Sequence, residues 1–570
     1  MSKISQQFKK CFSVDSFRLA WERYTRSNQR DGKDYIGISS FRRNLTLNIE
    51  VLSKEVISGK FDKNITRPPK FYKPKPNGTQ RTITILPIKD ALVFQAITNY
   101  VATRSFEKLN QNKDFILGSV LEEDVRLGNK LLRRKEANFF LFESWTANYK
   151  KFAESTSEQF RNTKVRYKLE TDLTGFYDTI PTFNLLSSIS KDYGVADDIL
   201  DLLGTCLGAW SGTKDGATPG IGIPQSADSS HFFANLYLHD VDEQISAEGW
   251  AYFRYMDDIC VFSYEKADLE RALCRLDQLM KTKGLSLNSN KTIIEEISEE
   301  DKEQKIFRDF NYAGDEENNG SKLSLVGSKD NNYDLVEQSG GIEFVKDGLV
   351  EETQSYDDEA ILDLAKSELQ IVTSEIPKIV VTLKASKEQK ISKERLREIT
   401  SLCFRYRMAQ EVFLEKNGKV SLNKTKLRSC WLYLSEKIFW KIDHFCWILN
   451  YYQEDMVVRK KLLALYSQNK LFEWTRSQII ECLCKSQKFS VKELRQIVYP
   501  MLVNEKSWFV KRFIYKLLLM QTDDKQLFKS IVAAAHKETY GPLKREILYL
   551  SNYWLRGGLT REQIIEIFGK

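Results

Sequence analysis

The sequence predicts an α+β domain followed by an all-α domain, with a short helical extension in front of them. Residues 61–350 mix stretches of alternating apolar and polar residues, typical of strands, with stretches of helical periodicity. Residues 351–570 show helical periodicity almost throughout. The stretch NYAGDEENNGSK, which begins at Asn311, is rich in Gly, Asn and acidic residues and indicates loops shortly before the pattern changes.

The composition is that of a folded protein with more than one core. Hydrophobic residues make up 42% and charged residues 29% of the 570 positions. The 86 basic residues exceed the 78 acidic ones, and this modest excess permits a nucleic-acid partner without demonstrating one. Nine cysteines at scattered spacings give neither a disulfide framework nor a zinc pattern, and indicate reduced thiols. With no signal-peptide core and no apolar run of about 18 residues, we expect a cytoplasmic protein without a membrane partner.

Residues 1–60 read as amphipathic helices. Their apolar positions predict that Phe17, Leu19, Trp21 and Tyr24 are buried. We therefore expect a helical N-terminal extension over residues 1–60.

The stretch FRYMDDICVFS, residues 253–263, sets two aspartates between β-prone arms. It predicts a tight hairpin with Asp257 and Asp258 at its tip. Aspartate is common in turns, so the pair alone is weak evidence for a site. Two ionised carboxylates so close repel each other, and a bound divalent cation would offset this repulsion.

A third carboxylate follows a strand-like alternation in YKLETDLTGFYDTI. The strand is predicted to end at Asp172, and Gly175 allows the chain to turn into a helix. A neighbouring strand would then bring Asp172 beside Asp257. Carboxylate oxygens are the ligands that Mg²⁺ prefers, so the two stretches together predict a metal site.

Two segments are strongly basic. The first runs from Lys60 to Arg81 and also contains Phe71 and Tyr72. The second basic cluster consists of Arg126, Lys130, Arg133, Arg134 and Lys135. Such clusters often neutralise phosphates, and aromatic side chains stack on bases, although a solvated surface is the common alternative. The residues assigned to nucleic-acid binding are Lys70, Lys73, Arg133 and Arg134.

The C-terminal region contains a weak internal repeat. WTRSQIIECL, WFVKRFIYKLL and PLKREILYL each set a basic residue before apolar residues at helical spacing. The basic residues Arg476, Arg512 and Arg545 lie 36 and 33 residues apart. This period suits stacked helix pairs of the HEAT type, and an irregular helical bundle is the alternative.

Five ordered motifs resemble those of reverse transcriptases. DLTGFYD resembles motif A, GIGIPQSADSSHFFANLYLHDVD motif B, FRYMDD motif C and GLSLNSNKT motif D, while PKPNGTQRTITILPIKD resembles the fingers hairpin. The resemblance covers about residues 60–300. It implies the fingers and palm of a right-hand polymerase, and hence an RNA-directed DNA polymerase or DNA nucleotidyltransferase.

The resemblance also implies how the acidic residues act. Asp172 and Asp257 would hold two Mg²⁺ ions, for which Mn²⁺ could substitute, and Asp258 would assist them. Two such ions activate an attacking 3′-hydroxyl and stabilise the leaving pyrophosphate. The substrates implied are dNTPs and the product DNA.

Five further residues match positions that contact the nucleotide. Tyr177 matches the steric gate, whose ring excludes a ribose 2′-hydroxyl, and Gln225 matches a residue that packs near the nucleotide. Lys75 and Arg81 match cations that contact the phosphates, and Lys291 matches the lysine that assists proton transfer to pyrophosphate.

A reverse transcriptase palm followed by a helical repeat resembles the bacterial abortive-infection reverse transcriptases. This kinship implies antiphage defence, DNA synthesis without a supplied template, priming from a protein hydroxyl, and a homo-oligomer. Three alternatives stay open: a conventional enzyme that copies an RNA template or a non-coding RNA, an RNA-synthesising polymerase, and a catalytically silent nucleic-acid-binding scaffold.

Overall fold

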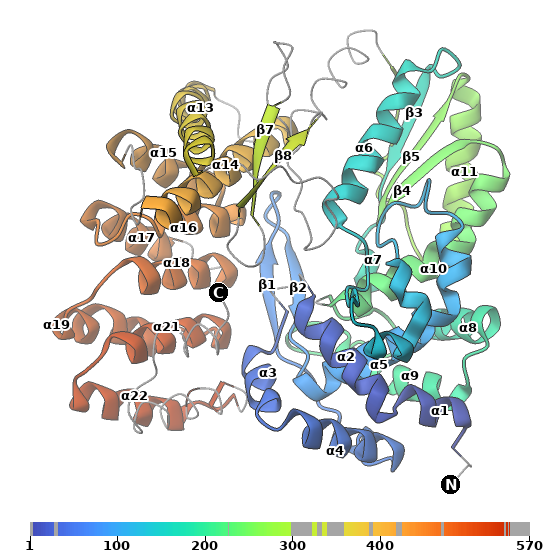
Figure 1. Cartoon of the computed structure of the whole chain (residues 1–570), viewed down its shortest axis with the longest axis horizontal. Coiled ribbons are helices and arrows are strands. Elements are labelled where there is room, and N and C mark those ends of the chain that lie inside the picture. Colours follow the sequence, from blue (N-terminus) through green and yellow to red (C-terminus); the bar gives the residue numbers. More distant parts are fainter. Residues whose placement is uncertain are drawn as a thin grey trace. The chain divides into compact units, whose positions relative to one another are not determined.

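The chain forms two compact units in a computed structural model (Figure 1). The structure describes residues 4–27, 32–225, 227–297, 322–327, 333–338, 358–386, 391–417, 424–468 and 472–540, together with 543, 544 and 547. The first unit comprises Met1–Lys70 and Thr82–Asp309, and the second Phe71–Arg81 and Phe310–Lys570. The predicted boundary at residue 350 lies outside the described residues, and the predicted domain limits stay predictions.

The N-terminal segment is helical, as predicted. It forms α1 (Gln6–Cys11), α2 (Val14–Arg26), α3 (Tyr35–Arg42) and α4 (Leu45–Ile57). Phe17, Leu19, Trp21 and Tyr24 on α2 are all buried. α2 packs against the long helix α5 (Ile88–Asn110), so the extension shares one core with the rest of the first unit.

A four-stranded antiparallel sheet lies in the first unit, in the order β4-β5-β3-β6. Its strands are β3 (Tyr167–Thr171), β4 (Ala251–Tyr255), β5 (Asp258–Ser263) and β6 (Ile293–Glu296). The register pairs Thr171 with Ile259 and Tyr255 with Asp258. The end of β3 therefore lies beside the turn that joins β4 to β5.

Helices complete the first unit. They are α6 (Trp145–Arg161), α7 (Phe176–Thr179), α8 (Thr182–Tyr193), α9 (Asp197–Trp210), α10 (Asp228–Ala247) and α11 (Lys266–Thr282), with the 3₁₀ segments η1 (Asp62–Asn64) and η2 (Glu123–Arg133). α11 packs on β3 and β5, and α10 packs on α5, α11 and β4. The apolar face of α10, which includes Phe233 and Tyr237 at four-residue spacing, is buried.

The expected fingers hairpin is present as a two-stranded sheet of β1 (Lys70–Pro74) and β2 (Gln80–Thr84). Its tip closes through a bond from the Lys75 N–H to the Thr79 carbonyl, at 2.7 Å. Residues Phe71–Arg81 belong to the second unit, while the flanking Lys70 and Thr82 belong to the first.

The second unit is mainly helical. Its helices are α13 (Asp358–Ala385), α14 (Lys393–Asn417), α15 (Lys424–Lys437), α16 (Ile442–Leu449), α17 (Met456–Gln468), α18 (Glu473–Ser486), α19 (Val491–Glu493), α20 (Tyr499–Asn504), α21 (Trp508–Gln521) and α22 (Lys525–Lys537). Shorter elements are η3 (Phe439–Lys441), η4 (Leu494–Val498) and a hairpin of β7 (Lys322–Gly327) and β8 (Tyr333–Gln338).

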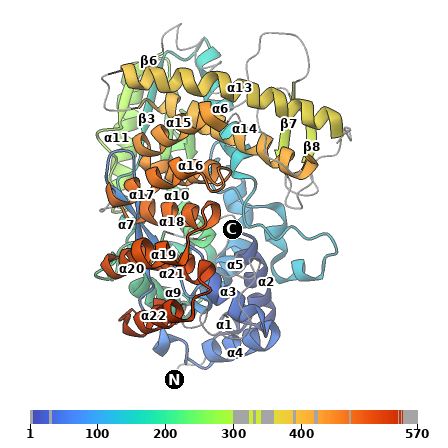
Figure 2. The same cartoon turned by 90° about the vertical axis from the view of Figure 1, so that its left-hand side faces the viewer.

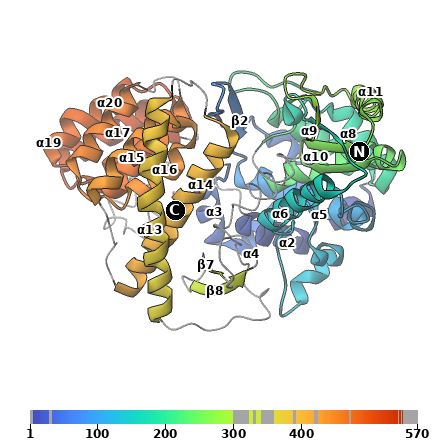
Figure 3. The same ribbon diagram turned by 90° about the horizontal axis from the view of Figure 1, so that it is seen from above.

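The helices of this unit are stacked. α13 and α14 lie side by side (Figure 3), and α14, α16, α18, α21 and α22 then pack in succession (Figure 2). The repeated arginines Arg476 and Arg512 fall on α18 and α21, two helices in contact, whereas Arg545 lies outside the described residues.

All nine cysteines are free thiols, and eight of them are buried. No helix among the described residues combines the length and the apolar character that crossing a bilayer requires.

Candidate active site

The predicted hairpin is present, with Asp257 in the turn between β4 and β5 and Asp258 as the first residue of β5. Tyr255 and Asp258 are paired across it, which leaves Met256 and Asp257 as the turn residues. Met256 has a φ of 56°, in the left-handed region that few residues other than glycine adopt. Such a conformation is costly and persists only when the surroundings enforce it.

Arg254 supplies one of these constraints. Its Nη1 donates to the Met256 carbonyl at 2.8 Å, while Nε and Nη2 donate to the two carboxylate oxygens of Asp242 at 2.7 and 2.5 Å. Both side chains are fully buried. Burial opposes the charge on Arg254, but Asp242 outweighs it and the pKa of the guanidinium is raised. The network ties the turn to α10, and the motifs did not predict it.

The segment Phe115–Ser119 supplies a second constraint. It runs beside β4, with Arg254 N–H donating to the Phe115 carbonyl and Leu117 N–H to the Arg254 carbonyl, both at 2.9 Å. A Cβ on Gly118 would come within 2.3 Å of the Met256 nitrogen, so only glycine fits there. The turn is therefore held on two sides.

Asp172 follows β3 directly and is 4% exposed. Continued by one residue, the register of β3 and β5 sets Asp172 opposite Asp258. Its Oδ2 forms an ion pair with Lys291 Nζ, and its buried Oδ1 has no hydrogen-bond partner. Asn288 N–H donates to its carbonyl at 2.8 Å, which fixes the backbone.

Lys291 interacts electrostatically with all three acids. Burial lowers the pKa of Lys291, but its bond to Asp172 and the charges of Asp172, Asp258 and Asp257 outweigh burial and raise it. One ammonium thus lies in the field of all three carboxylates. The structure therefore gathers the predicted acids and Lys291 at one edge of the sheet.

The chemistry of this cluster fits a hard divalent cation. Asp172 presents a buried carboxylate oxygen without a hydrogen bond, and such an atom is costly unless it finds a partner. Across the described part of the chain, no three His, Cys, Asp or Glu side chains are already arranged as metal ligands. In this structure the ammonium of Lys291 supplies the positive charge beside Asp172.

In the first unit, the chain segments that carry Tyr177 and Gln225 run side by side. Ile223 N–H donates to the Tyr177 carbonyl at 2.8 Å, so the loop before α10 runs beside α7. The Tyr177 hydroxyl is hydrogen-bonded to His231 Nδ1 at 2.5 Å. The Gln225 carbonyl accepts from Thr84 N–H at 3.0 Å, which ties the end of β2 to this loop.

The structure contradicts the prediction that Lys70 binds nucleic acid. Lys70 is buried at 3% exposure. Its Nζ donates to Thr84 Oγ1 at 2.9 Å and to the Trp210 carbonyl at 2.5 Å. Burial lowers its pKa to about 8. A phosphate cannot reach an ammonium that is enclosed and used in this way.

The other predicted cations are on the surface. Lys75 and Arg81 lie exposed on the hairpin, in the second unit, so their relation to the aspartates stays a prediction. Arg133 and Arg134 are exposed beside η2, and Arg134 pairs with Asp124 at 2.7 Å. This pair reduces the net positive charge of the second basic cluster.

The aromatic residues of the hairpin also differ from expectation. Phe71 and Tyr72 were read as stacking on bases, but Phe71 is buried against Phe509 and Trp474, with ring centroids 3.9 and 5.7 Å away. Tyr72 N–H donates to Glu473 Oε1 at 2.6 Å. Lys73 lies over the Trp474 ring at 4.3 Å. Helices α18 and α21 thus hold one strand of the hairpin.

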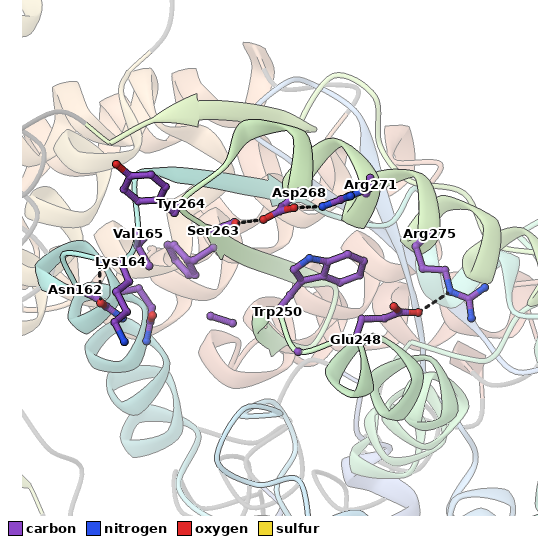
Figure 4. A pocket seen from close by; sticks show the side chains of 14 residues that line it. Asn162, Lys164, Val165, Glu248, Trp250, Ser263, Tyr264, Asp268, Arg271 and Arg275 are labelled. Carbon is purple, nitrogen blue, oxygen red and sulfur yellow. Dashed lines mark hydrogen bonds and ion pairs between the residues drawn. The ribbon is translucent and has the colours of Figure 1, made fainter.

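A cavity of about 820 Å³ lies at the other end of β4 and β5 (Figure 4). Trp250, Ser263, Asp268 and Arg271 are among its lining residues. Asp268 accepts from Ser263 at 2.9 Å and pairs with Arg271. The cavity is separate from the acidic cluster because it adjoins the start of β4 and the end of β5.

Known proteins resemble part of the chain. Residues 73–308 match the family described as reverse transcriptase (RNA-dependent DNA polymerase). No curated protein matches the chain in sequence.

Telomerase from Candida tropicalis, solved with a fragment of telomeric RNA, is 12% identical with a TM-score of 0.30, over 86% of this chain and 68% of that one. Telomerase from Candida albicans, also solved with such a fragment, is 12% identical with a TM-score of 0.29, over 80% and 65%. Likenesses this low support no statement about the chain.

The family match covers the motifs that carry the acidic cluster and Lys291, and also the hairpin motif. Residues 73–308 form a reverse transcriptase domain, the domain of RNA-directed DNA polymerases.

Proposed function

We propose that the protein is a DNA polymerase of the reverse transcriptase type that joins dNTPs by two-metal nucleotidyl transfer. The observation that carries this proposal is the meeting of Asp172, Asp257 and Asp258 around Lys291 at the end of β3. A reverse transcriptase domain spans the same residues.

In this proposal Asp172 and Asp257 hold the cations and Asp258 assists them. Mg²⁺, or Mn²⁺ in its place, supplies the charge that activates a 3′-hydroxyl and stabilises pyrophosphate. Lys291 keeps its proton at neutral pH because its pKa is raised, so it can deliver a proton to the leaving group. The buried network of Arg254 and Asp242 keeps the turn in place while these groups act.

The remaining predicted residues contact the incoming nucleotide or the nucleic acid. Tyr177 faces the sugar, Gln225 packs beside the nucleotide, and Lys75 and Arg81 bind its phosphates. Lys73, Arg133 and Arg134 contact nucleic acid. DNA is the product.

We propose that synthesis serves antiphage defence, needs no supplied template, and begins on a hydroxyl of the protein in a homo-oligomer. The kinship to abortive-infection enzymes supports these points. The contact of α18 with α21, which carry Arg476 and Arg512 at the repeat spacing, supports a HEAT-like second unit.

One experiment separates the forms of this proposal. The purified protein is incubated with Mg²⁺ and each labelled dNTP in turn, without template, and then with an RNA template. Protease and nuclease digestion of the product shows whether DNA forms and whether it is attached to protein. Product only with RNA would indicate conventional reverse transcription. Parallel incubations contain labelled rNTPs, and incorporation of ribonucleotides instead of dNTPs would indicate an RNA polymerase.

The matched variants are Asp257→Ala and Asp201→Ala. Asp201 lies exposed on α9, so its loss should leave incorporation unchanged. Asp257→Ala should abolish incorporation without unfolding the protein. A folded Asp257→Ala protein with normal incorporation would overturn the metal assignment. A wild-type protein without activity would favour the alternative of a catalytically silent nucleic-acid-binding scaffold. Phage plating with the wild-type and Asp257→Ala genes tests the defence role; equal plating across many phages would remove it.

A further inference from the structure

His231 lies in the first turn of α10 and is hydrogen-bonded to Tyr177. The Tyr177 hydroxyl and His231 Nδ1 are 2.5 Å apart. Their rings are perpendicular, with centroids at 5.5 Å and an interplanar angle of 89°. No sequence motif assigns a role to this histidine.

Tyr177 is held at both ends. Its backbone carbonyl accepts from Ile223 N–H at 2.8 Å, and its hydroxyl is bonded to His231. The ring also contacts Phe176 at 5.5 Å. The backbone bond fixes where the side chain starts, and the hydroxyl bond and the contact with Phe176 restrain the ring, so the ring has little freedom to tilt.

We propose that His231 is a specificity-determining residue that locks the Tyr177 ring against ribonucleotides. The inference rests on the proposed function, in which Tyr177 faces the sugar of the incoming nucleotide. A ring excludes a 2′-hydroxyl only if it stays in place when the larger sugar presses on it. The hydrogen bond to His231 opposes that displacement. A neutral imidazole with its proton on Nε2 leaves Nδ1 free to accept from the hydroxyl.

Tyr177 and His231 have different roles in the selection of the sugar. The Tyr177 ring supplies the steric barrier, and His231 keeps the barrier rigid. Loss of the ring should remove most of the discrimination. Loss of the hydrogen bond alone should relax it by about 3- to 10-fold, the range expected for one hydrogen bond.

The test measures kcat/KM for a dNTP and for the matching rNTP, and takes their ratio. His231→Ala and Tyr177→Phe should each lower the ratio about 3- to 10-fold, chiefly by raising ribonucleotide use. The double variant should lower it no further, because both changes remove the same bond. His231→Asn should restore much of the ratio, since its amide can occupy the position of Nδ1.

Tyr100→Phe is the matched control. The Tyr100 hydroxyl donates to Gln7 at 3.1 Å and takes no part in the bond between Tyr177 and His231, so its loss should leave the ratio unchanged. Additive effects of His231→Ala and Tyr177→Phe, or an unchanged ratio in either, would overturn the proposal. Should His231→Ala fail to fold, Tyr177→Phe and His231→Asn decide the question. A wild-type protein that incorporates neither nucleotide would instead refute the proposed function.

Discussion

Arg254 and Asp242 form a fully buried, two-bond ion pair, and the same guanidinium donates to the carbonyl of Met256. The pair therefore connects α10 to the turn that carries Asp257. Removing one partner of a buried pair leaves the other charge without compensation.

We expect Asp242→Asn to destabilise the first unit by about 3–5 kcal/mol, the usual cost of breaking a buried pair. Incorporation should also fall, because the Met256 turn loses its anchor. Urea unfolding followed by tryptophan fluorescence measures the first effect. Asp268→Asn is the control: its partner Arg271 is largely exposed, so about 1 kcal/mol or less is at stake. Similar midpoints for the two variants would contradict this role for the pair.

Gly118→Ala should disturb the turn between β4 and β5 without touching any carboxylate. The new methyl group would lie 2.3 Å from the Met256 nitrogen, so either the Phe115–Ser119 segment or the turn must move. We expect kcat to fall about tenfold or more, which corresponds to about 1.4 kcal/mol in the barrier. Gly208→Ala, on α9, meets no atom within 4 Å and should keep full activity. Normal turnover in Gly118→Ala would show that the turn tolerates displacement.

Lys291→Met should make stability depend on the cation. Without the ammonium, Asp172 loses its ion-pair partner and the three carboxylates repel one another. We expect a lower melting temperature without Mg²⁺ and a larger rise on adding Mg²⁺ than in the wild type. Differential scanning calorimetry with and without Mg²⁺ measures both. If Asp257→Asn added to Lys291→Met leaves this rise intact, the cation binds elsewhere.

Asp90 should make the first unit less stable at higher pH. It is buried on α5, and burial raises its pKa to about 7, although a bond from Trp210 Nε1 at 3.1 Å lowers it somewhat. A raised pKa in the folded state gives stability that is present below about pH 4 and is lost as the pH rises through about 7. Asp90→Asn removes this loss and keeps an acceptor for Trp210. Its melting temperature should exceed that of the wild type at pH 8 by more than at pH 5. An equal difference at both pH values would show that Asp90 titrates normally.

Phe71→Ala should weaken the hold of α18 and α21 on the hairpin. Phe71 is fully buried between Phe509 and Trp474, so its truncation should cost about 3–5 kcal/mol in the second unit. If Lys75 and Arg81 bind the triphosphate, KM for dNTPs should rise more than kcat falls. Phe183→Ala removes a ring that is 77% exposed and serves as the control. An unchanged KM in a destabilised Phe71→Ala protein would separate the hairpin from nucleotide binding.

The sequence predicted the elements around the site because each has a local signal. Alternation in YKLET predicts β3, the adjacent aspartates interrupt two β-prone arms, and four-residue spacing from Phe233 predicts α10. The structure contains these elements, although β3 ends at Thr171, one residue before the predicted end, and Asp258 begins β5. The roles of Asp172, Asp257 and Asp258 stay predictions until they are measured.

Long-range contacts could not be predicted in this way. Arg254 looks like an ordinary strand residue, and its partner Asp242 is on a helix that only the fold brings near. Lys70 and Phe71 were misread because charge and aromaticity in a basic segment suggest solvent and bases, whereas burial depends on residues as distant as Trp210 and Phe509. A short stretch of sequence does not indicate which distant residues will be in contact with it.

The hairpin at Phe71–Arg81 has a consequence for how this protein can be divided. A fragment that ends at residue 309 would retain the matched polymerase motifs but expose Phe71, and a fragment of the helices alone would leave Trp474 and Phe509 without their ring partner. Neither piece is a self-sufficient module, so recombination that exchanges one for a foreign counterpart must also carry over the matching aromatic residues.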